Sequence, residues 1–242
     1  MTEAPLPSAD ELRRRCGENL TALEARIAAA CQRAGRGVGE VTLIGVTKYV
    51  GADLTGMLVE CGCRELAESR PQQVWDKAAA LVDLAPRWHL VGHLQRNKVR
   101  RTLPVVSLVH TLDSLRLLAA IEAEAAAASR PCDVLVEVNL TADPERSGCP
   151  EAEVPALVAA AAAAPHVRLR GLMGMASHPD SAAADARRDF ARLREMRDRL
   201  ARDVPPEMLR ELSMGMSGDF AEAILEGSTM VRIGSALFEG MR

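Results

Sequence analysis

Aromatic residues are scarce in this chain, which has two Trp, one Tyr and three Phe among its 242 residues. Its core must therefore consist mainly of Leu, Val, Ile, Ala and Met. The hydrophobic share of 48% with 26% charged residues is typical of a globular protein and excludes a disordered chain. No apolar run approaches the ~20 residues that a membrane span requires, and residues 1–15 lack the pattern of a signal peptide. We expect a cytoplasmic protein that does not enter the membrane.

An excess of one charge is also absent, because the net charge is -3 and the isoelectric point is near 6.0. This balance gives no general attraction for nucleic acid. The densest basic run, residues 96–101, contains no aromatic side chain on which a base could stack and is more typical of a solvated helix start. We therefore expect no nucleic-acid partner.

Several signature motifs are missing as well. The six cysteines include no Cys-x-x-Cys pair, so a disulfide scaffold, a zinc site and a redox site lack support, and reduced thiols are expected. The chain has no Gly-x-Ser-x-Gly elbow, no Walker loop and no Gly-x-Gly-x-x-Gly fingerprint. These absences exclude the hydrolases, nucleotide-binding proteins and dinucleotide-binding proteins that depend on such motifs.

Strand-like and helix-like segments alternate along the chain. Residues 10–34 have the apolar period of a helix, with Ser8 or Asp10 as its N-cap and Gly35 as its end. Residues 41–47 form a β-branched apolar run that is typical of a strand buried on both faces. Further strands are predicted at residues 65–67, 88–91, 108–111, 134–138, 169–173, 211–214 and 230–233, and helices at 54–61, 72–82, 97–103, 114–129, 151–164, 182–203 and 218–225.

This alternation predicts one α/β domain. Strands that alternate with helices form right-handed βαβ units on a parallel sheet, and eight such units close into a (β/α)8 TIM barrel. The double proline at positions 205 and 206 falls between a helix and a strand rather than in a linker. We expect residues 1–242 to form a single barrel with a leading N-terminal helix.

The first candidate site residue is Lys48, which directly follows the first predicted strand. Active sites of such barrels lie at the carboxyl ends of the strands. A lysine there is expected to be partly desolvated, which favours a neutral amine that can attack a carbonyl carbon. A surface lysine in a βα loop is the alternative, and position alone does not decide between the two.

The loops after the last two strands contain candidates for a phosphate site. They read Ser-Met-Gly-Met-Ser-Gly-Asp at residues 213–219 and Arg-Ile-Gly-Ser at residues 232–235. Loops in this position of a barrel often bind phosphate through backbone N–H groups, and the hydroxyls of Ser217 and Ser235 can donate to its oxygens. Glycine and serine are common in loops, so this pattern gains weight only together with Lys48.

Arg232 lies on the last predicted strand and is expected to point toward the same cavity. If it faces a pyridine nitrogen, its permanent positive charge disfavours protonation of that nitrogen and weakens the ring as an electron sink. An ion pair with Glu137 is the alternative, and both interpretations place Arg232 inside the barrel.

Seven segments from the first strand to the last match one family pattern. They are Val-Thr-Lys at 46–48, Trp-His-Leu-Val-Gly-His-Leu-Gln-Arg-Asn-Lys at 88–98, Val-Asn at 138–139, Arg-Ser-Gly at 146–148, Gly-Leu-Met at 171–173, Leu-Ser-Met-Gly-Met-Ser at 212–217 and Gly-Ser-Thr-Met-Val-Arg-Ile-Gly at 227–234. In these segments the chain resembles the pyridoxal phosphate homeostasis proteins, which are similar to the N-terminal barrel of alanine racemase. The resemblance implies pyridoxal 5'-phosphate (PLP) as the cofactor. It also implies that Lys48 forms a Schiff base with PLP, that Arg232 meets the pyridine nitrogen, and that the phosphate is held by Met216, Ser217, Gly234 and Ser235.

The chain departs from the family pattern at two positions. Where the family usually has Gly-Glu-Asn after the second strand, this chain has Ala67, Glu68 and Ser69, and the serine offers different hydrogen bonds from an asparagine. Arg96 stands where the family usually has a small residue, which adds a cation near the rim of the expected site.

Other polar residues have more than one interpretation. His89 and His93 are four positions apart but flank a predicted strand and lack a third ligand nearby, so a metal site is not expected. His110 and Asn139 each end a predicted strand. Contact with the cofactor is one role for them, and a satisfied buried imidazole and a turn residue are the alternatives.

Two classes of function follow. A racemase-like enzyme needs acid–base groups on both faces of its substrate, and in alanine racemase a tyrosine from an additional domain serves one face. The single tyrosine here, Tyr49, is next to Lys48 and is not expected to reach that position. We therefore expect a non-catalytic monomer that binds PLP, takes part in intracellular PLP homeostasis and supplies PLP-dependent apoenzymes. A PLP-dependent racemase-like enzyme is the alternative, and a cofactor-free Schiff-base aldolase fits Lys48 and the loops by chemistry alone.

Overall fold

Eight parallel strands form a closed barrel in the computed structural model, which describes residues 8–141, 143, 146–177 and 185–241. The strands are β1 (Thr42–Val46), β2 (Glu65–Glu68), β3 (Arg87–Leu90), β4 (Leu108–Leu112), β5 (Cys132–Asn139), β7 (Val167–Gly174), β8 (Glu211–Ser213) and β9 (Met230–Ile233). They pair in the order β4-β3-β2-β1-β9-β8-β7-β5, and β4 also pairs with β5, which closes the ring. The predicted α/β barrel and its eight strands are confirmed.

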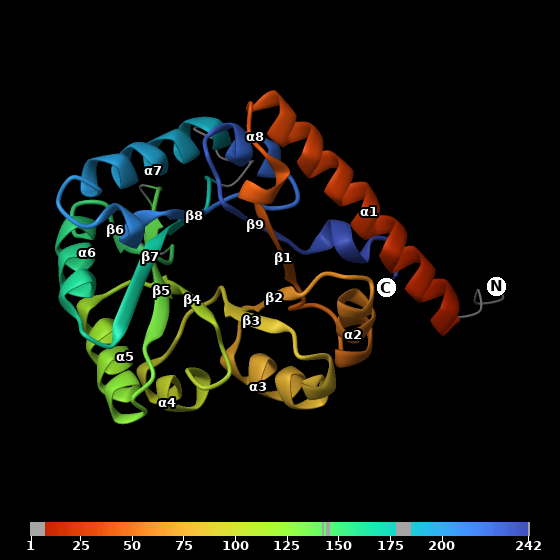
Figure 1. Ribbon diagram of the computed structural model, residues 1–242, viewed down its shortest axis with the longest axis horizontal. Coiled ribbons are helices and arrows are strands. Elements are labelled where there is room, and N and C mark those ends of the chain that lie inside the picture. Colours follow the sequence, from red (N-terminus) through yellow and green to blue (C-terminus); the bar gives the residue numbers. More distant parts are fainter. Residues whose placement is uncertain (1–7, 142, 144–145, 178–184, 242) are drawn as a thin grey trace.

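Helices surround these strands in Figure 1. They are α1 (Ala9–Arg33), α2 (Ala52–Glu60), α3 (Pro71–Ala80), α4 (Val99–Thr102), α5 (Leu115–Ala127), α6 (Val154–Ala163), α7 (Ala186–Leu200) and α8 (Phe220–Leu225). The leading helix α1 lies along the outside of the barrel (Figure 1), and its N-cap is Ser8, whose Oγ accepts a hydrogen bond from the backbone N of Glu11 at 3.2 Å. No helix in the described ranges is long and apolar enough to cross a membrane.

Some boundaries differ from the predicted ones for local reasons. The helix predicted at 97–103 is a 3₁₀ turn, η3 (Arg96–Lys98), followed by the four-residue α4. The helix predicted at 151–164 begins only at Val154, because Pro155 favours the first turn of a helix. Residues 182–184 of the helix predicted at 182–203 lie outside the described residues, and the helix is seen from Ala186.

One short strand, β6 (Cys149–Pro150), was not predicted. It pairs with the carboxyl end of β5, where Val138 lies opposite Cys149. Its two residues are too few for any periodic pattern. Gly148, the residue before β6, lies close against β5, because a Cβ on it would lie 2.6 Å from the backbone N of Asn139. Its φ of +108° is also one that favours glycine.

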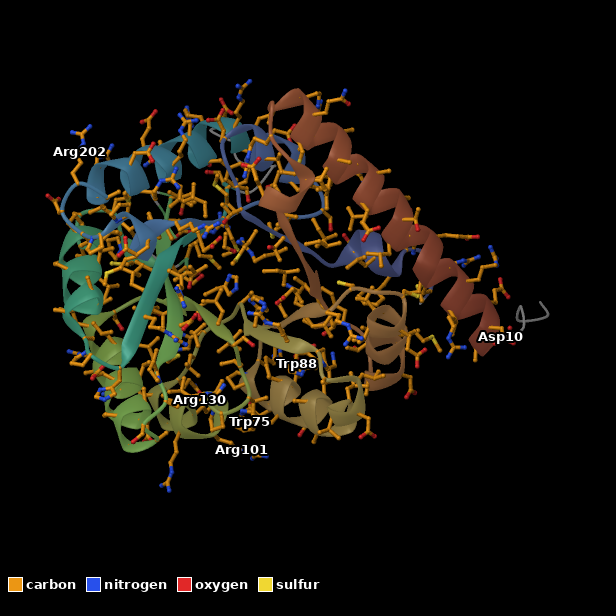
Figure 2. All side chains as sticks on the ribbon, viewed as in Figure 1. Asp10, Trp75, Trp88, Arg101, Arg130 and Arg202 are labelled. Atoms are coloured by element: carbon orange, nitrogen blue, oxygen red, sulfur yellow. The ribbon has the colours of Figure 1, made fainter. Side chains whose placement is uncertain are left out.

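The core is mainly aliphatic, as the composition predicts. A small cluster of Leu108, Leu135 and Met173 from β4, β5 and β7 packs together separately from the main core, which lies between strands and helices. Four aromatic side chains, Trp88, Phe190, Phe220 and Phe238, are buried in the main core. Another, Trp75, lies beside Arg101 in Figure 2, with the guanidinium carbon 4.1 Å from the ring centroid. This pair joins α3 to α4 on the outside of the barrel.

Candidate functional site at the carboxyl rim of the barrel

Three neighbouring strands bring the predicted site residues to one rim. β1 pairs with β9, with Gly45 opposite Ile233, and β8 pairs with β9 through Ser213 and Met230. The loops that follow β8, β9 and β1 therefore leave the barrel side by side. The approach is close, because a Cβ on Gly234 would lie 3.3 Å from the carbonyl oxygen of Val46.

Lys48 leaves this rim as an exposed side chain. The expectation that it would be partly desolvated is wrong, because Thr47 takes the buried position after β1 and Lys48 turns outward. Its Nζ lies 4.9 Å from the ring centroid of Tyr49, which is 67% exposed. The amine is thus accessible at the end of β1, beside the only aromatic ring in this loop.

A buried ion pair between Lys77 and Glu68 fixes the backbone directly before Lys48. Lys77 of α3 donates to Glu68 Oε1, to the carbonyl of Thr47 at 2.8 Å and to Thr47 Oγ1 at 3.3 Å. Thr47 Oγ1 also donates to Glu68 Oε1 at 2.6 Å. These bonds fix the residue directly before Lys48. The second oxygen of this carboxylate, Glu68 Oε2, is buried without a hydrogen-bond partner among the described residues. The end of β2 therefore has one unused hydrogen-bond acceptor.

Arg232 is buried inside the barrel, as predicted. It donates to Ser213 Oγ at 2.7 Å and to the carbonyl of Gly174 at 3.0 Å, whereas Glu137 accepts a bond from Ser147 at 2.7 Å. Burial lowers the pKa of Arg232 to about 10, and the charges of Glu137 and Asp219 oppose that shift. Arg232 therefore stays a cation at neutral pH, held by β7 and β8.

The loop after β8 provides less free backbone than the sequence suggests. The N–H of Met216 donates to Asp219 Oδ1 at 2.6 Å, so an anion at this position has to compete with that carboxylate. Burial raises the pKa of Asp219, while the bond from Met216 and the charge of Arg232 oppose that effect. Ser217 is half-buried and Ser235 is exposed at the start of η5 (Ser235–Phe238). Both hydroxyls lie at the surface of the rim.

These features fit a cofactor that carries an aldehyde, a pyridine ring and a phosphate. Lys48 presents an accessible amine, Arg232 a buried cation on the adjacent strand, and the loops after β8 and β9 two serine hydroxyls beside glycines. The backbone at Gly234 is close to its neighbour, and a Cβ there would require Val46 to move by a few tenths of an ångström.

A row of polar side chains that the sequence did not reveal lies below Arg232. Ser213 Oγ is 2.9 Å from His110 Nδ1, His110 Nε2 is 2.9 Å from His89 Nδ1, and His89 Nε2 is 2.7 Å from Glu65 Oε2. Burial, with the charge of Arg232, lowers the pKa of His110 well below its ordinary value. His110 is therefore a buried, hydrogen-bonded imidazole, which was one of its two interpretations.

The remaining candidates lie around the rim or serve the loops. His93 is exposed and faces Asp113 at 3.5 Å, away from the hydrogen bonds of His89. The side chain of Asn139 organises its own turn, since its Oδ1 accepts from the N of Thr141 at 3.0 Å. Arg96 is exposed and lines an open groove of about 590 Å³ after β3 and β4.

Ser69, the departure from the family pattern after β2, lies with its backbone against Gly92. A Cβ on Gly92 would lie 2.1 Å from the carbonyl oxygen of Ser69, so the loops after β2 and β3 touch through their backbones. A larger cavity of about 910 Å³ opens elsewhere, at the amino-terminal side of β5 near α4 and α5, and none of the predicted site residues lines it.

The fold and this rim define a barrel of the alanine racemase type. Residues 19–241 match the family described as "Alanine racemase, N-terminal domain". The chain also resembles an alanine racemase structure from Clostridium difficile with a TM-score of 0.68 at 14% identity, which covers 82% of this chain and 52% of that chain and shows the fold alone.

Two proteins with higher sequence identity to this chain identify its family within this class of barrels. The chain is 38% identical over 221 residues to the pyridoxal phosphate homeostasis protein of Aquifex aeolicus, covering 91% of this chain and 96% of that protein. It superposes on PipY from Synechococcus elongatus, in the structure with PLP bound, with a TM-score of 0.80 at 30% identity, covering 92% and 99% of the two chains. The chain therefore belongs to the family of pyridoxal phosphate homeostasis proteins.

Proposed function

We propose that this protein binds PLP, holds it as a Schiff base on Lys48 and takes part in intracellular PLP homeostasis without catalysing a reaction of its own. The observation that carries the proposal is the arrangement of the rim: an exposed lysine follows β1, a buried arginine lies on the adjacent β9, and two loops of Gly and Ser lie beside them. The names of the relatives and the PLP-bound structure of PipY support the same ligand.

Each residue has a distinct role in this proposal. PLP supplies an aldehyde that condenses with an amine, and Lys48 is the amine. Arg232 meets the pyridine nitrogen, and its permanent charge keeps that nitrogen unprotonated. Met216, Ser217, Gly234 and Ser235 hold the phosphate, with Asp219 giving up the N–H of Met216 to it.

The geometry favours a carrier over a racemase-like enzyme. Racemisation requires a proton to leave one face of the substrate and return on the other. Tyr49 is next to Lys48 in sequence, and its ring lies beside the Lys48 amine, so both groups would reach a bound substrate from the same face. A cationic partner for the pyridine nitrogen further weakens the ring as an electron sink. A monomer that passes PLP to apoenzymes of other PLP-dependent proteins is the role we assign.

Borohydride reduction tests the attachment directly. The chain has three lysines, Lys48, Lys77 and Lys98, so peptide mapping distinguishes every candidate. We expect a visible absorbance after PLP is added, and a reduced adduct on the peptide that contains Lys48. The matched control is Lys98→Ala, which removes another rim lysine and should bind PLP normally, whereas Lys48→Ala should not form the adduct. A colourless protein, or an adduct on Lys98 alone, refutes the proposal.

Two further assays separate the carrier from the enzyme and test the phosphate loops. Transfer of PLP from the loaded protein to a PLP-dependent apoenzyme is expected, with recovery of that enzyme's activity. Turnover of alanine or another amino acid by the loaded protein, lost in Lys48→Ala, would show an enzyme instead. Replacing Ser217 and Ser235 together with Ala should weaken PLP binding while the unfolding curve stays unchanged, and an unchanged affinity refutes their assignment.

A further inference from the structure

A continuous row of hydrogen-bonded side chains crosses the barrel from Arg232 to the opposite mouth. Ser213 of β8, His110 of β4 and His89 of β3 are all buried, and Glu65 of β2 is the last member. Glu65 and His89 line a cavity of about 230 Å³ at the amino-terminal ends of the strands. The row thus has one end at the cofactor rim and the other in a cavity on the far side of the barrel.

We infer that this row is a hydrogen-bond relay in which the Glu65 carboxylate sets the tautomers of His89 and His110 and so orients Ser213 to accept a hydrogen bond from Arg232. Glu65, His89, His110 and Ser213 are positioning residues, because they act on the cofactor through Arg232. The inference deepens the proposed function and rests on its assignment of Arg232 to the pyridine ring.

The donors and acceptors of the row allow one direction when Glu65 is ionised. Arg232 has only donors, so Ser213 Oγ accepts from it, and the single hydroxyl proton of Ser213 goes to His110 Nδ1. His110 then carries its proton on Nε2 and donates to His89 Nδ1, and His89 donates from its own Nε2 to the carboxylate. Both imidazoles are neutral in this state, and every group in the row has a partner.

Protonation of Glu65 reverses the row. The carboxyl group takes up one proton from water, keeps it, and uses it to donate a hydrogen bond to His89 Nε2. Each histidine then carries its single proton on Nδ1 and no longer on Nε2. Ser213 Oγ then accepts an N–H from His110 as well as one from Arg232, which occupies both of its lone pairs and leaves its own hydroxyl proton without His110 as an acceptor. One proton is gained and two tautomers change. The carboxylate form is therefore the one in which Ser213 donates its proton to His110 and accepts from Arg232 alone.

The surroundings of Glu65 favour its carboxylate form. Burial acts to raise its pKa, but the hydrogen bond from His89 and the charge of Arg87, whose Nη1 lies 3.2 Å from Glu65 Oε1, oppose burial, and the pKa is lowered. The other charged groups at this mouth are Asp133 on β5, Arg170 on β7, Glu207 and Arg210 before β8, and Glu211 on β8.

Several of these charges are already paired. Asp133 Oδ2 accepts from Arg170 at 2.8 Å, and Glu211 Oε2 accepts from Thr229 at 2.6 Å. At the other end of the row, Glu137 and Asp219 act on Arg232. The nearest charged partners of the relay itself are thus Arg87 at the entrance and Arg232 at the rim.

Nitrogen NMR of the histidine rings tests the relay without any cofactor. The chain has five histidines, and ¹⁵N shifts distinguish the Nδ1–H and Nε2–H tautomers of each. We expect His89 and His110 to be single Nε2–H tautomers at neutral pH in the wild type, and mixtures in Glu65→Gln. Glu65→Asp retains the carboxylate and should restore the wild-type tautomers. Glu122→Gln is the matched control, because Glu122 binds His166 at 2.8 Å outside the row and should leave His89 and His110 unchanged.

PLP titration then measures the effect on the site. Glu65→Gln is expected to weaken PLP binding by about threefold to tenfold, the range for one lost hydrogen bond, and to shift the absorbance of the bound cofactor. In a Ser213→Ala background the same change should have no further effect, because the link to Arg232 is already broken. The control Glu122→Gln should bind like the wild type.

The two levels of the test fail separately. Unchanged tautomers of His110 in Glu65→Gln overturn the relay, whether or not the protein binds PLP. Equal and additive losses of PLP affinity in Glu65→Gln and Ser213→Ala overturn it as well, because independent sites add. Altered tautomers in a protein that binds no PLP support the relay and refute the proposed function instead.

Discussion

Lys77 offers the sharpest test of how the site is supported. Its ammonium group is buried with the carboxylate of Glu68 and with the carbonyl of Thr47, the residue before Lys48. Lys77→Met keeps most of the side chain's length and packing but leaves the Glu68 carboxylate buried without its cation. Removing one partner of a buried pair costs about 3–5 kcal/mol, because a charge then remains uncompensated.

That cost translates into a large thermal shift. A chain of this size loses about 2–4 °C of Tm per kcal/mol, so we expect Lys77→Met to melt roughly 6–20 °C below the wild type. Calorimetry and urea unfolding both measure the change. The double variant Glu68→Gln, Lys77→Met removes both charges and should recover much of the loss. PLP affinity should fall in the single variant, since the Thr47 carbonyl beside Lys48 loses the bond from Lys77 and keeps only the one from the N–H of Val50.

The control for this prediction is an exposed pair. Arg14 and Glu18 are paired on the surface of α1, where solvent screens the charges, and Arg14→Met should change the Tm little. A Lys77→Met protein that melts with the wild type would show that the buried pair does not stabilise the loop. A double variant that is as unstable as the single one would show that packing, rather than the uncompensated charge, is responsible.

Three other features yield predictions. Gly171→Ala should lower the free energy of unfolding in urea by more than about 4 kcal/mol or prevent folding, because the new Cβ would lie 1.8 Å from the carbonyl oxygen of Glu211; wild-type stability would contradict the packing of β7 on β8. Glu137→Gln should stabilise the protein at neutral pH. Burial, opposed in part by the hydrogen bond from Ser147, raises the pKa of Glu137 above its ordinary 4.5. The ionised carboxylate therefore destabilises the fold fully above the folded-state pKa, and this destabilisation fades as the pH falls below 4.5. A gain in the free energy of unfolding of Glu137→Gln that is equal at all pH values would disprove this cause. A thiol-reactive dye should label Cys61 first, because the other five cysteines are buried, and rapid labelling that persists in Cys61→Ser would contradict this order.

The barrel could be predicted because its signal is local. Each strand is a short β-branched or apolar run between turn residues, and β9 was predicted with the boundaries it has in the structure. Lys48, Arg232 and the two loops follow from the rule that barrel sites lie at the carboxyl ends of strands. The burial of Lys48 could not be judged in this way, because whether its side chain or that of Thr47 turns inward depends on contacts made by Glu68 and Lys77.

The interior row escaped prediction because its members are distant in sequence. His110 and Ser213 are 103 positions apart and share no motif. Their contact depends on the barrel closing with β4 and β8 across from one another. Glu65 begins a predicted strand but carried no signal of its own, since a glutamate at a strand start is common at a solvated mouth. The sequence indicated only that two neighbouring predicted strands each contain a histidine, His89 and His110.

The seam between β1 and β9 has a consequence for the order of synthesis. The loop of Lys48 and the loop of Ser235 meet only when β9 has been made and pairs with β1. The helix α1 secures the same seam, because Asn19 donates to the carbonyls of Leu237 and Glu239 at 3.2 and 3.1 Å. Contacts of such long sequence separation form late. A growing chain thus keeps the two loops of the candidate site apart until β9 has been made, so a chain cut before β9 would have only one half of this rim.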